Sequence, residues 1–122
     1  MTRILVIDDD EIVREAIGQV LEEAGYDVAY ATDGRRGFGL FKKLRPDLVI
    51  TDIIMPETEG IETMLEIKRQ SPTVPVLVIS GGARIVDLDF LESARKLGAD
   101  DVLAKPFDDD ELLARVRHCL KE

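Results

Sequence analysis

The sequence predicts an α/β fold in which a doubly wound, parallel sheet of five strands is covered by helices on both faces. Two observations predict this class. Short apolar runs alternate with segments of helical periodicity along the whole chain. The strongest runs are continuously apolar rather than alternating, which is typical of parallel strands buried on both faces. A length of 122 residues, 45% of them hydrophobic, suits one domain with one core.

The strands are expected from these apolar runs. Three strong strands are predicted at Ile4–Ile7, Leu48–Ile50 and Val74–Ile79. Two weaker strands are predicted at Asp27–Ala31 and Asp101–Ala104. A helical segment follows each strand, so the chain repeats the order strand–helix with no linker or low-complexity stretch.

The helix after the first strand has the clearest pattern, because its apolar residues recur at intervals of three and four. These residues are Val13, Ala16, Ile17, Val20, Leu21 and Ala24. Gly25 follows, where a glycine commonly ends a helix. The same pattern in shorter form predicts helices from Ile61 to Lys68, from Leu91 to Leu97 and from Leu112 to Leu120. Three aspartates at 108–110 precede the last helix, where the helix dipole favours negative charge.

The segment Gly34–Leu44 is a weaker helix candidate. It contains Gly37 and Gly39, each of which costs a helix about 1 kcal/mol relative to alanine. We still predict a helix here, because Phe38, Phe41 and Leu44 form one apolar face before Arg45–Pro46 ends the segment.

Charge and cysteine content exclude several classes of function. The net charge of −9 argues against direct binding to a nucleic-acid backbone. The apolar runs are too short to span a membrane, and the first residues are too few for a signal-peptide core. Cys119 is the only cysteine, which rules out an internal disulfide and a cysteine metal cluster. These features predict a cytoplasmic protein with no membrane partner.

Polar side chains follow four of the five expected strands. They are Asp8, Asp9 and Asp10 after the first strand, Asp52 at the end of the third, Ser80 at the end of the fourth and Lys105 after the fifth. The second strand leads into Thr32–Asp33–Gly34, which is an ordinary turn and helix cap. Doubly wound sheets place their sites beyond the carboxyl ends of the strands. We therefore expect the carboxylates, the hydroxyl and the ammonium to converge.

The clustered carboxylates indicate a cation site. Neighbouring carboxylates repel one another unless a hard cation neutralises them, and Mg²⁺ binds carboxylates together with carbonyls, waters and phosphate oxygens. A lysine and a serine beside the ion are suitable donors to a tetrahedral anion. Taken singly, each residue has another interpretation, since Asp9 or Asp10 could cap the first helix and Asp52 could be a turn residue. Together they predict that the stretch ILVIDDDE forms half of a Mg²⁺ site and Asp52 the other half.

Four stretches resemble the receiver domain of two-component response regulators. They are DDD at the first strand end, ITDIIMPETEG around Asp52, ISGG at Ser80 and GADDVLAKPF around Lys105. The resemblance runs from Ile4 to the last helix. It implies a flavodoxin-like sheet with strand order 2-1-3-4-5, and a single receiver domain over residues 1–122 with no output domain in this chain.

The resemblance also implies a role for each site residue. Asp52 accepts a phosphoryl group from a phosphohistidine on a histidine kinase or histidine phosphotransfer protein, with Lys105 contacting the phosphoryl group and Ser80 donating a hydrogen bond to it. Asp9 and Asp52 ligate Mg²⁺ directly, Asp8 acts through a coordinated water, and the backbone carbonyl of Ile54 is a further ligand. Phosphorylation then switches the surface presented to a downstream protein or output domain, so the protein is a signalling switch rather than an enzyme with turnover. Asp10 and Glu11 have no such role and are interpreted as helix cap and first-turn charge.

The sequence departs from the family pattern at two places. The usual aromatic residue three positions before the lysine is replaced by Val102, so the usual coupling between hydroxyl and aromatic ring cannot operate in its normal form. The segment between Ser80 and Gly98 is a few residues longer than expected, which predicts a rearranged loop or helix. The resemblance further implies a cis peptide bond at Lys105–Pro106, although trans is the commoner state in general.

Two other functions are compatible with parts of the sequence. IDDDEI approximates the motif of haloacid-dehalogenase-type phosphatases, with Asp8 as nucleophile and Asp10 as acid/base. Against this, the chain is short for that fold and the ITDIIMP stretch is unexplained. A phosphorylation-independent interaction module on the same fold is the second alternative, but such a module would not require the complete site set. The identity of the phosphorylated aspartate, Asp52 or Asp8, discriminates the first alternative.

Overall fold

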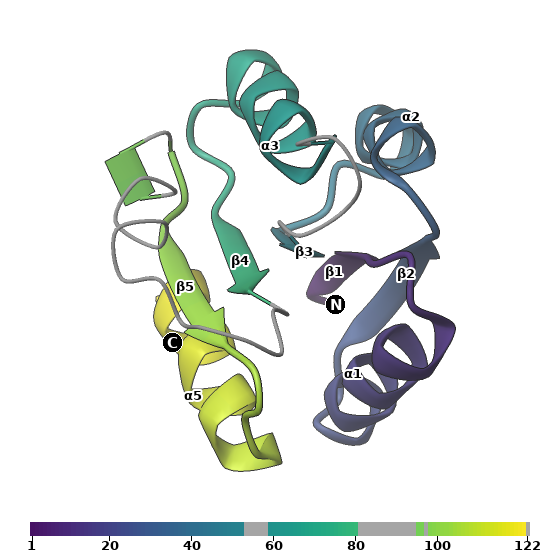
Figure 1. The fold of residues 1–122 in the computed structure, drawn as a ribbon, viewed down its shortest axis with the longest axis vertical. Coiled ribbons are helices and arrows are strands. Elements are labelled where there is room, and N and C mark those ends of the chain that lie inside the picture. The colour runs from purple at the N-terminus through teal and green to yellow at the C-terminus, as the bar shows by residue number, and fades with distance from the viewer. Residues whose placement is uncertain (53–58, 81–94, 97, 122) are drawn as a thin grey trace.

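A five-stranded sheet lies at the centre of the molecule, with helices packed on both of its faces (Figure 1). The structure is a computed structural model and describes residues 1–52, 59–80, 95–96 and 98–121. The strands are β1 (Arg3–Ile7), β2 (Asp27–Ala31), β3 (Leu48–Asp52), β4 (Val76–Ser80) and β5 (Asp101–Ala104). The helices are α1 (Glu11–Glu23), α2 (Gly34–Leu44), α3 (Glu59–Gln70) and α5 (Asp109–Leu120). No helix among these residues is long and apolar enough to cross a membrane.

The strand order is β2-β1-β3-β4-β5 and every neighbouring pair is parallel, which confirms the predicted fold class. The weaker elements β2, β5 and α2 have the predicted bounds, and β1, β3 and β4 differ from prediction by one or two residues at their ends. The helix predicted from Leu91 to Leu97 lies mostly outside the described residues. Within that range the structure describes Arg95 and Lys96, and both are helical.

The sheet separates two apolar layers, with α2 and α3 on one face and α1 and α5 on the other (Figure 1). The first layer includes Leu5, Ile7, Phe41, Met64 and Ile67. The second layer includes Ile4, Val6, Ile17, Leu21 and Leu112. Successive residues of β1 therefore enter opposite layers, and this double burial explains why the strand is apolar at consecutive positions.

Aspartate side chains begin three of the helices. The carboxylate of Asp10 accepts hydrogen bonds from the backbone N–H groups of Ile12 and Val13 at the start of α1. Asp33 and Asp108 make the equivalent bonds at α2 and α5. These bonds satisfy N–H groups that have no partner within the helix. The interpretation of Asp10 as a cap, and of Glu11 as first-turn charge, is confirmed.

Gly37 allows α2 to approach β1 closely. A Cβ at this position would overlap the fully buried side chain of Ile7, whereas a Cβ at Gly39 would meet open space. Replacing Gly37 with alanine is expected to lower the free energy of unfolding by about 1–3 kcal/mol. The matched change Gly39→Ala should raise it by up to about 1 kcal/mol, through helix propensity alone. Urea unfolding of the two variants checks this, and equal effects would contradict it.

Candidate metal centre

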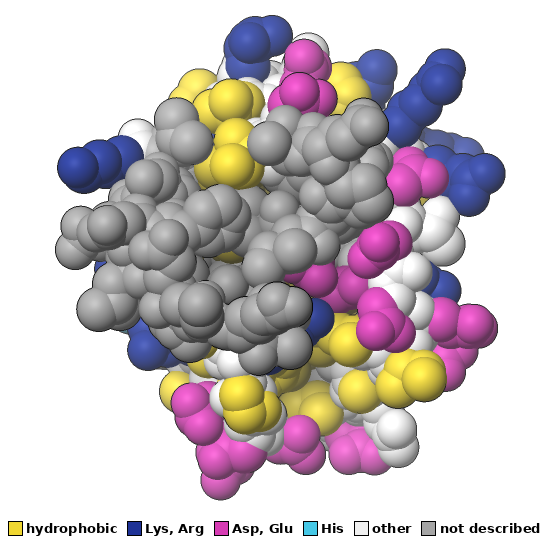
Figure 2. Space-filling model, in the orientation of Figure 1, with side chains coloured by type: hydrophobic (Ala, Val, Ile, Leu, Met, Phe, Trp, Pro, Cys, Tyr) yellow, Lys and Arg dark blue, Asp and Glu magenta, His cyan; other side chains and the backbone are white. Residues whose placement is uncertain are grey.

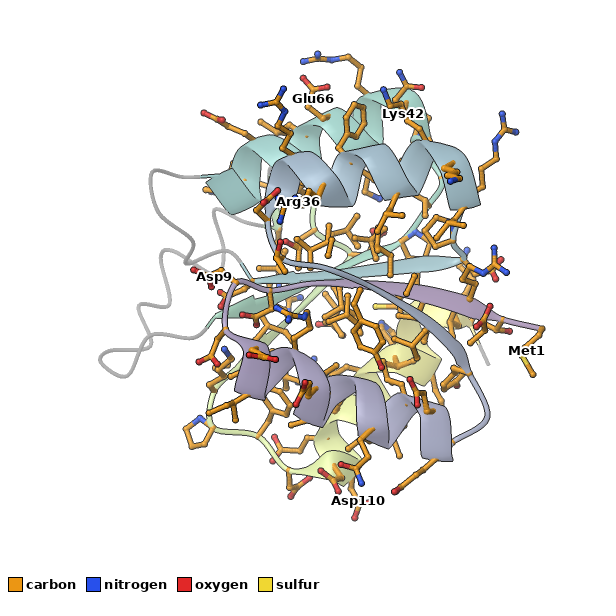
Figure 3. The ribbon with its side chains drawn as sticks, turned by 90° about the vertical axis from the view of Figure 1, so that its right-hand side faces the viewer. Met1, Asp9, Arg36, Lys42, Glu66 and Asp110 are labelled. Atoms are coloured by element: carbon orange, nitrogen blue, oxygen red, sulfur yellow. The ribbon has the colours of Figure 1, made fainter. Side chains whose placement is uncertain are left out.

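The candidate site lies at the carboxyl edge of the sheet, where the chain leaves β1 and β3. Ile7 of β1 is paired with Thr51 of β3, so the next residues, Asp8 and Asp52, are neighbours across the two strands. The strand order reverses between β1 and β3, which is where doubly wound sheets bind their ligands. Figure 3 places Asp9 at this end of the sheet, opposite the end that carries Met1.

Asp8 is held in place by backbone and side-chain contacts. One carboxylate oxygen, Oδ1, accepts a hydrogen bond of 2.8 Å from the Asp10 backbone N–H. The Asp8 backbone carbonyl accepts a bond of 2.9 Å from the guanidinium of Arg14 on α1. The second carboxylate oxygen, Oδ2, is buried and accepts no hydrogen bond in the part of the chain that the structure describes. A buried acceptor without a donor is costly, so this oxygen is suited to a cation.

Lys105 brings a positive charge to the same place from the end of β5. Its ammonium nitrogen lies 3.5 Å from Asp52 Oδ2 and 3.7 Å from Asp8 Oδ2. Asp52, like Asp8, is almost completely buried, with only 5% of its surface exposed. Among the described residues, the carboxylates of Asp8, Asp9 and Asp52 form one cluster, and the ammonium of Lys105 lies beside two of them, Asp8 and Asp52, which leaves the site with an excess of negative charge.

The ionisation of Asp8 reflects this excess. Burial raises the pKa of the Asp8 carboxyl above its ordinary value, and the negative charges of Asp52 and Asp9 raise it further. The hydrogen bond from Asp10 and the positive charge of Lys105 lower the pKa, but the net direction is upward. The folded protein therefore disfavours the ionised form of Asp8 unless a cation compensates.

The residues present fit a divalent cation. One carboxylate oxygen from each of Asp8, Asp9 and Asp52 lies within 4.8 Å of the other two. An all-oxygen set of this kind suits Mg²⁺, which uses few carboxylates and completes its shell with waters and phosphate oxygens. Asp9 is exposed, and solvent can therefore reach the cluster from its side.

The structure brings together four of the predicted site residues: Asp8, Asp9, Asp52 and Lys105. The backbone of Ser80 ends β4 beside Ala104, but its side chain lies outside the described residues, as does Ile54. The expected cis peptide bond at Lys105–Pro106 is present. The contact between Arg14 and the backbone carbonyl of Asp8 was not predicted. Nothing in the sequence indicates that the side chain of an arginine in a helix reaches back to the end of the preceding strand.

Comparison with known proteins decides the family. The sequence matches the response regulator receiver domain family over residues 4–117, which is nearly the whole chain. The chain belongs to this family. Receiver domains are signalling components of two-component systems, and the acidic cluster of this one is consistent with a phosphoaspartate and Mg²⁺ site.

Curated relatives carry a similar receiver domain within a longer protein. The DNA-binding dual master transcriptional regulator RpaA of Synechocystis sp. is 41% identical over 99% of this chain. The response regulator MprA of Mycolicibacterium vanbaalenii is 40% identical over 98% of it. In both cases the match covers 50% of the relative, so the chain spans about half the length of these curated relatives.

Solved structures show the same fold. A response regulator receiver domain protein from Clostridium thermocellum superimposes with a TM-score of 0.90 at 32% identity, covering 99% of this chain and 95% of that one. The chemotaxis protein CheY4 of Vibrio cholerae gives a TM-score of 0.86 at 29% identity, covering 98% of both chains. The flavodoxin-like strand order expected from the sequence is thus confirmed for this receiver domain.

Val102 departs from the usual receiver-domain pattern, and the structure shows what replaces the aromatic ring. Its side chain is buried and packs in the apolar layer shared with α2 and α3. Val102 has no aromatic ring that could move between solvent and interior, so its side chain contributes only to the hydrophobic core. The segment between Ser80 and Gly98, which the sequence predicts to be longer than usual, lies outside the described residues except for Arg95 and Lys96.

Proposed function

We propose that this receiver domain accepts a phosphoryl group on Asp52 from a phosphohistidine of a histidine kinase or histidine phosphotransfer protein, with Mg²⁺ as cofactor. The observation that supports it most is the convergence of Asp8, Asp9, Asp52 and Lys105 at the strand-order reversal, with a buried Asp8 oxygen that lacks a donor in the described part of the chain. A phosphorylation-independent module would need neither the buried carboxylates nor the lysine between them.

The chain's own residues supply most of the chemistry. An oxygen of Asp52 attacks phosphorus, so the new O–P bond forms as the N–P bond of the phosphohistidine breaks. The ammonium of Lys105, 3.5 Å from Asp52 Oδ2, is placed to stabilise negative charge on the transferring group. The Ser80 hydroxyl donates a hydrogen bond to the attached phosphoryl group.

Four groups would hold Mg²⁺: the carboxylates of Asp8, Asp9 and Asp52, and the backbone carbonyl of Ile54. The bound ion would offset the negative charge of the phosphoryl oxygens. Residues 1–122 act as a single cytoplasmic domain and as a switch, in which the phosphoryl group biases a two-state surface read by a downstream protein or output domain. The acidity of the chain supports a protein rather than nucleic acid as the direct partner.

The test of this proposal is transfer from protein to protein. A phosphorylated histidine phosphotransfer protein is mixed with this chain, and the phosphoryl group is followed from donor to acceptor with and without Mg²⁺. We expect the group to move to this chain only when Mg²⁺ is present. Retention of the phosphoryl group on every donor tried, with Mg²⁺ present, would contradict the proposed function.

An apolar groove beside the site supports a protein as phosphodonor. The groove has a volume of about 510 Å³ and lies between one side of α1 and the chain that follows β5, including the first turn of α5. Its lining includes Ile12, Val13, Phe107 and Lys105, so it adjoins the site through the lysine. Ile12 is 79% exposed, so it presents a large apolar side chain to solvent at the edge of the groove. A helix of the phosphodonor that covers this groove would bring its phosphohistidine to Asp52.

Ile12→Glu is expected to slow transfer from a protein donor by about tenfold or more, because a charge would replace an apolar anchor. Phosphorylation by acetyl phosphate should be unchanged, since in the described part of the chain Ile12 forms no hydrogen bond with a residue of the site. Leu65→Glu on α3 is the matched control, because Leu65 is also an exposed apolar residue but lies away from the groove. Rates from both donors check this, and equal slowing with both donors would contradict it.

A further inference from the structure

The exposed face of α2 carries a concentration of positive charge that the phosphorylation site does not use. Residues 34–45 include Arg35, Arg36, Lys42, Lys43 and Arg45 and no acidic residue, in a chain whose net charge is −9. All five side chains are exposed. Figure 2 shows Lys and Arg side chains projecting at the upper right, over α2, whereas most Asp and Glu side chains on this side lie below, over α1 and α5.

Several of these cations are without a counter-ion. Within the described part of the chain, Arg35, Lys43 and Arg45 form no ion pair. Lys42 lies over the ring of Phe38, 4.9 Å from its centroid, and Figure 3 shows Lys42 directed away from the sheet. Arg36 is the exception, since it pairs with Asp33 at 3.8 Å. Like charges on one helix face repel each other, so an anionic partner would relieve this repulsion.

Gly39 lies in the middle of the same face. In helical spacing, Arg35, Gly39, Lys42 and Lys43 fall on one side of α2, which we call the α2 basic face. Gly37 is required by its contact with Ile7, but a side chain at Gly39 would meet nothing within 4 Å. A glycine inside a helix is destabilising relative to alanine, and here no contact within the described chain explains it. Because Gly39 has no side chain and lies among basic residues, the backbone of another protein segment can approach α2 closely at this position.

We propose that the α2 basic face is a docking surface for a short acidic helix of a partner protein. An eleven-residue helix such as α2 is only about 16 Å long, and the sequence outside residues 34–45 carries 25 acidic against 11 basic residues. A long nucleic acid or an anionic membrane would extend over the rest of the chain and be repelled by its net negative charge. A short acidic helix can stay on the basic face, with its own backbone close to Gly39. The α2 basic face is distinct from the Asp52 site, whose described residues Asp8, Asp9, Asp52 and Lys105 all lie outside α2.

The probe is an alanine-rich helical peptide with a glutamate at every third or fourth position, titrated into the full chain at low ionic strength and followed by fluorescence anisotropy. We expect saturable binding that weakens as salt is added. Arg35→Glu and Lys43→Glu should each weaken binding by about fivefold. Lys96→Glu, which changes the net charge equally on an exposed lysine outside α2, should leave binding unchanged. Equal losses in all three variants would overturn the proposal, since binding would then follow net charge alone.

Gly39→Gln separates docking from folding. The substituted helix should be at least as stable in thermal unfolding, because the new side chain meets open space, yet peptide binding should weaken severalfold. Unchanged peptide binding in this variant would overturn the role given to the glycine. Tighter binding of an oligonucleotide or of phosphatidylserine vesicles through the same arginines and lysines would overturn the choice of an acidic helix.

Discussion

Replacing Asp52 with asparagine is expected to abolish phosphorylation of this chain, from a protein donor and from acetyl phosphate alike. The amide of asparagine is a poor nucleophile, and loss of the attacking group costs on the order of 10³-fold or more in rate. The substituted side chain would keep nearly the same shape at a position that is 5% exposed, so the fold should persist. Intact mass after incubation with each donor measures the effect.

Asp10→Asn is the matched control for this change. Asp10 lies at the same edge of the sheet, and its carboxylate does no more than cap α1 in the described contacts. Asparagine caps a helix as well as aspartate does, so this variant should be phosphorylated like the wild type. Phosphorylation of Asp52→Asn to the wild-type extent would show that another residue is the acceptor.

Asp8→Asn should have two opposite effects, both large. In the metal-free protein at neutral pH, it should raise the free energy of unfolding by about 1–3 kcal/mol, because it removes a buried, incompletely paired charge. The sign follows from the raised pKa of Asp8. The folded state holds this proton more tightly than the unfolded chain does, so the ionisation of Asp8 destabilises the fold progressively as the pH rises from the ordinary pKa through the raised pKa. Near and below the ordinary pKa, where Asp8 is protonated, the advantage of the variant should disappear.

With Mg²⁺ present, the order should reverse. At a thousand times its dissociation constant, a ligand that binds only the folded state stabilises it by about 4.1 kcal/mol, which exceeds the metal-free advantage of the variant, and the variant should lose most of this gain. Urea unfolding with Mg²⁺ and with a chelator measures both effects. Asp9→Asn is the control, because Asp9 is exposed and its neutralisation should weaken Mg²⁺ binding while changing metal-free stability by less than about 0.5 kcal/mol. A less stable metal-free Asp8→Asn protein would contradict the account.

The fold was largely predictable from the sequence because its signals are local and agree with one another. Continuous apolar runs marked the strands, and Asp33 was predicted as a helix cap. Asp109 and Asp110 were predicted to precede the last helix, but they form its first turn after the cap at Asp108. Even α2 was predicted with its observed bounds despite two glycines, because its apolar face outweighed their cost. The reason for Gly37 could not be predicted, since it depends on a contact with Ile7 in a distant strand.

The candidate site was predictable in its membership but not in its electrostatics. The positions of Asp8, Asp9, Asp52 and Lys105 at strand ends were enough to predict that they lie close together, as the structure shows. Asp8 and Asp9 are the same residue type at adjacent positions, yet Asp8 is 1% exposed and Asp9 is exposed to solvent. This difference arises from the neighbouring strands that close around Asp8. The apolar groove beside the site was likewise beyond prediction, because residues from opposite ends of the chain line it.

The most direct test of the account is the intact mass of the wild-type chain after incubation with acetyl phosphate, with Mg²⁺ and with a chelator, followed by mapping of the modified residue. We expect one added phosphoryl group, located on Asp52 and absent when Mg²⁺ is removed. A phosphoryl group on Asp8 would contradict it in favour of a phosphatase-type site. The absence of any adduct, together with no capture of beryllofluoride, would contradict it in favour of an interaction module that works without phosphorylation.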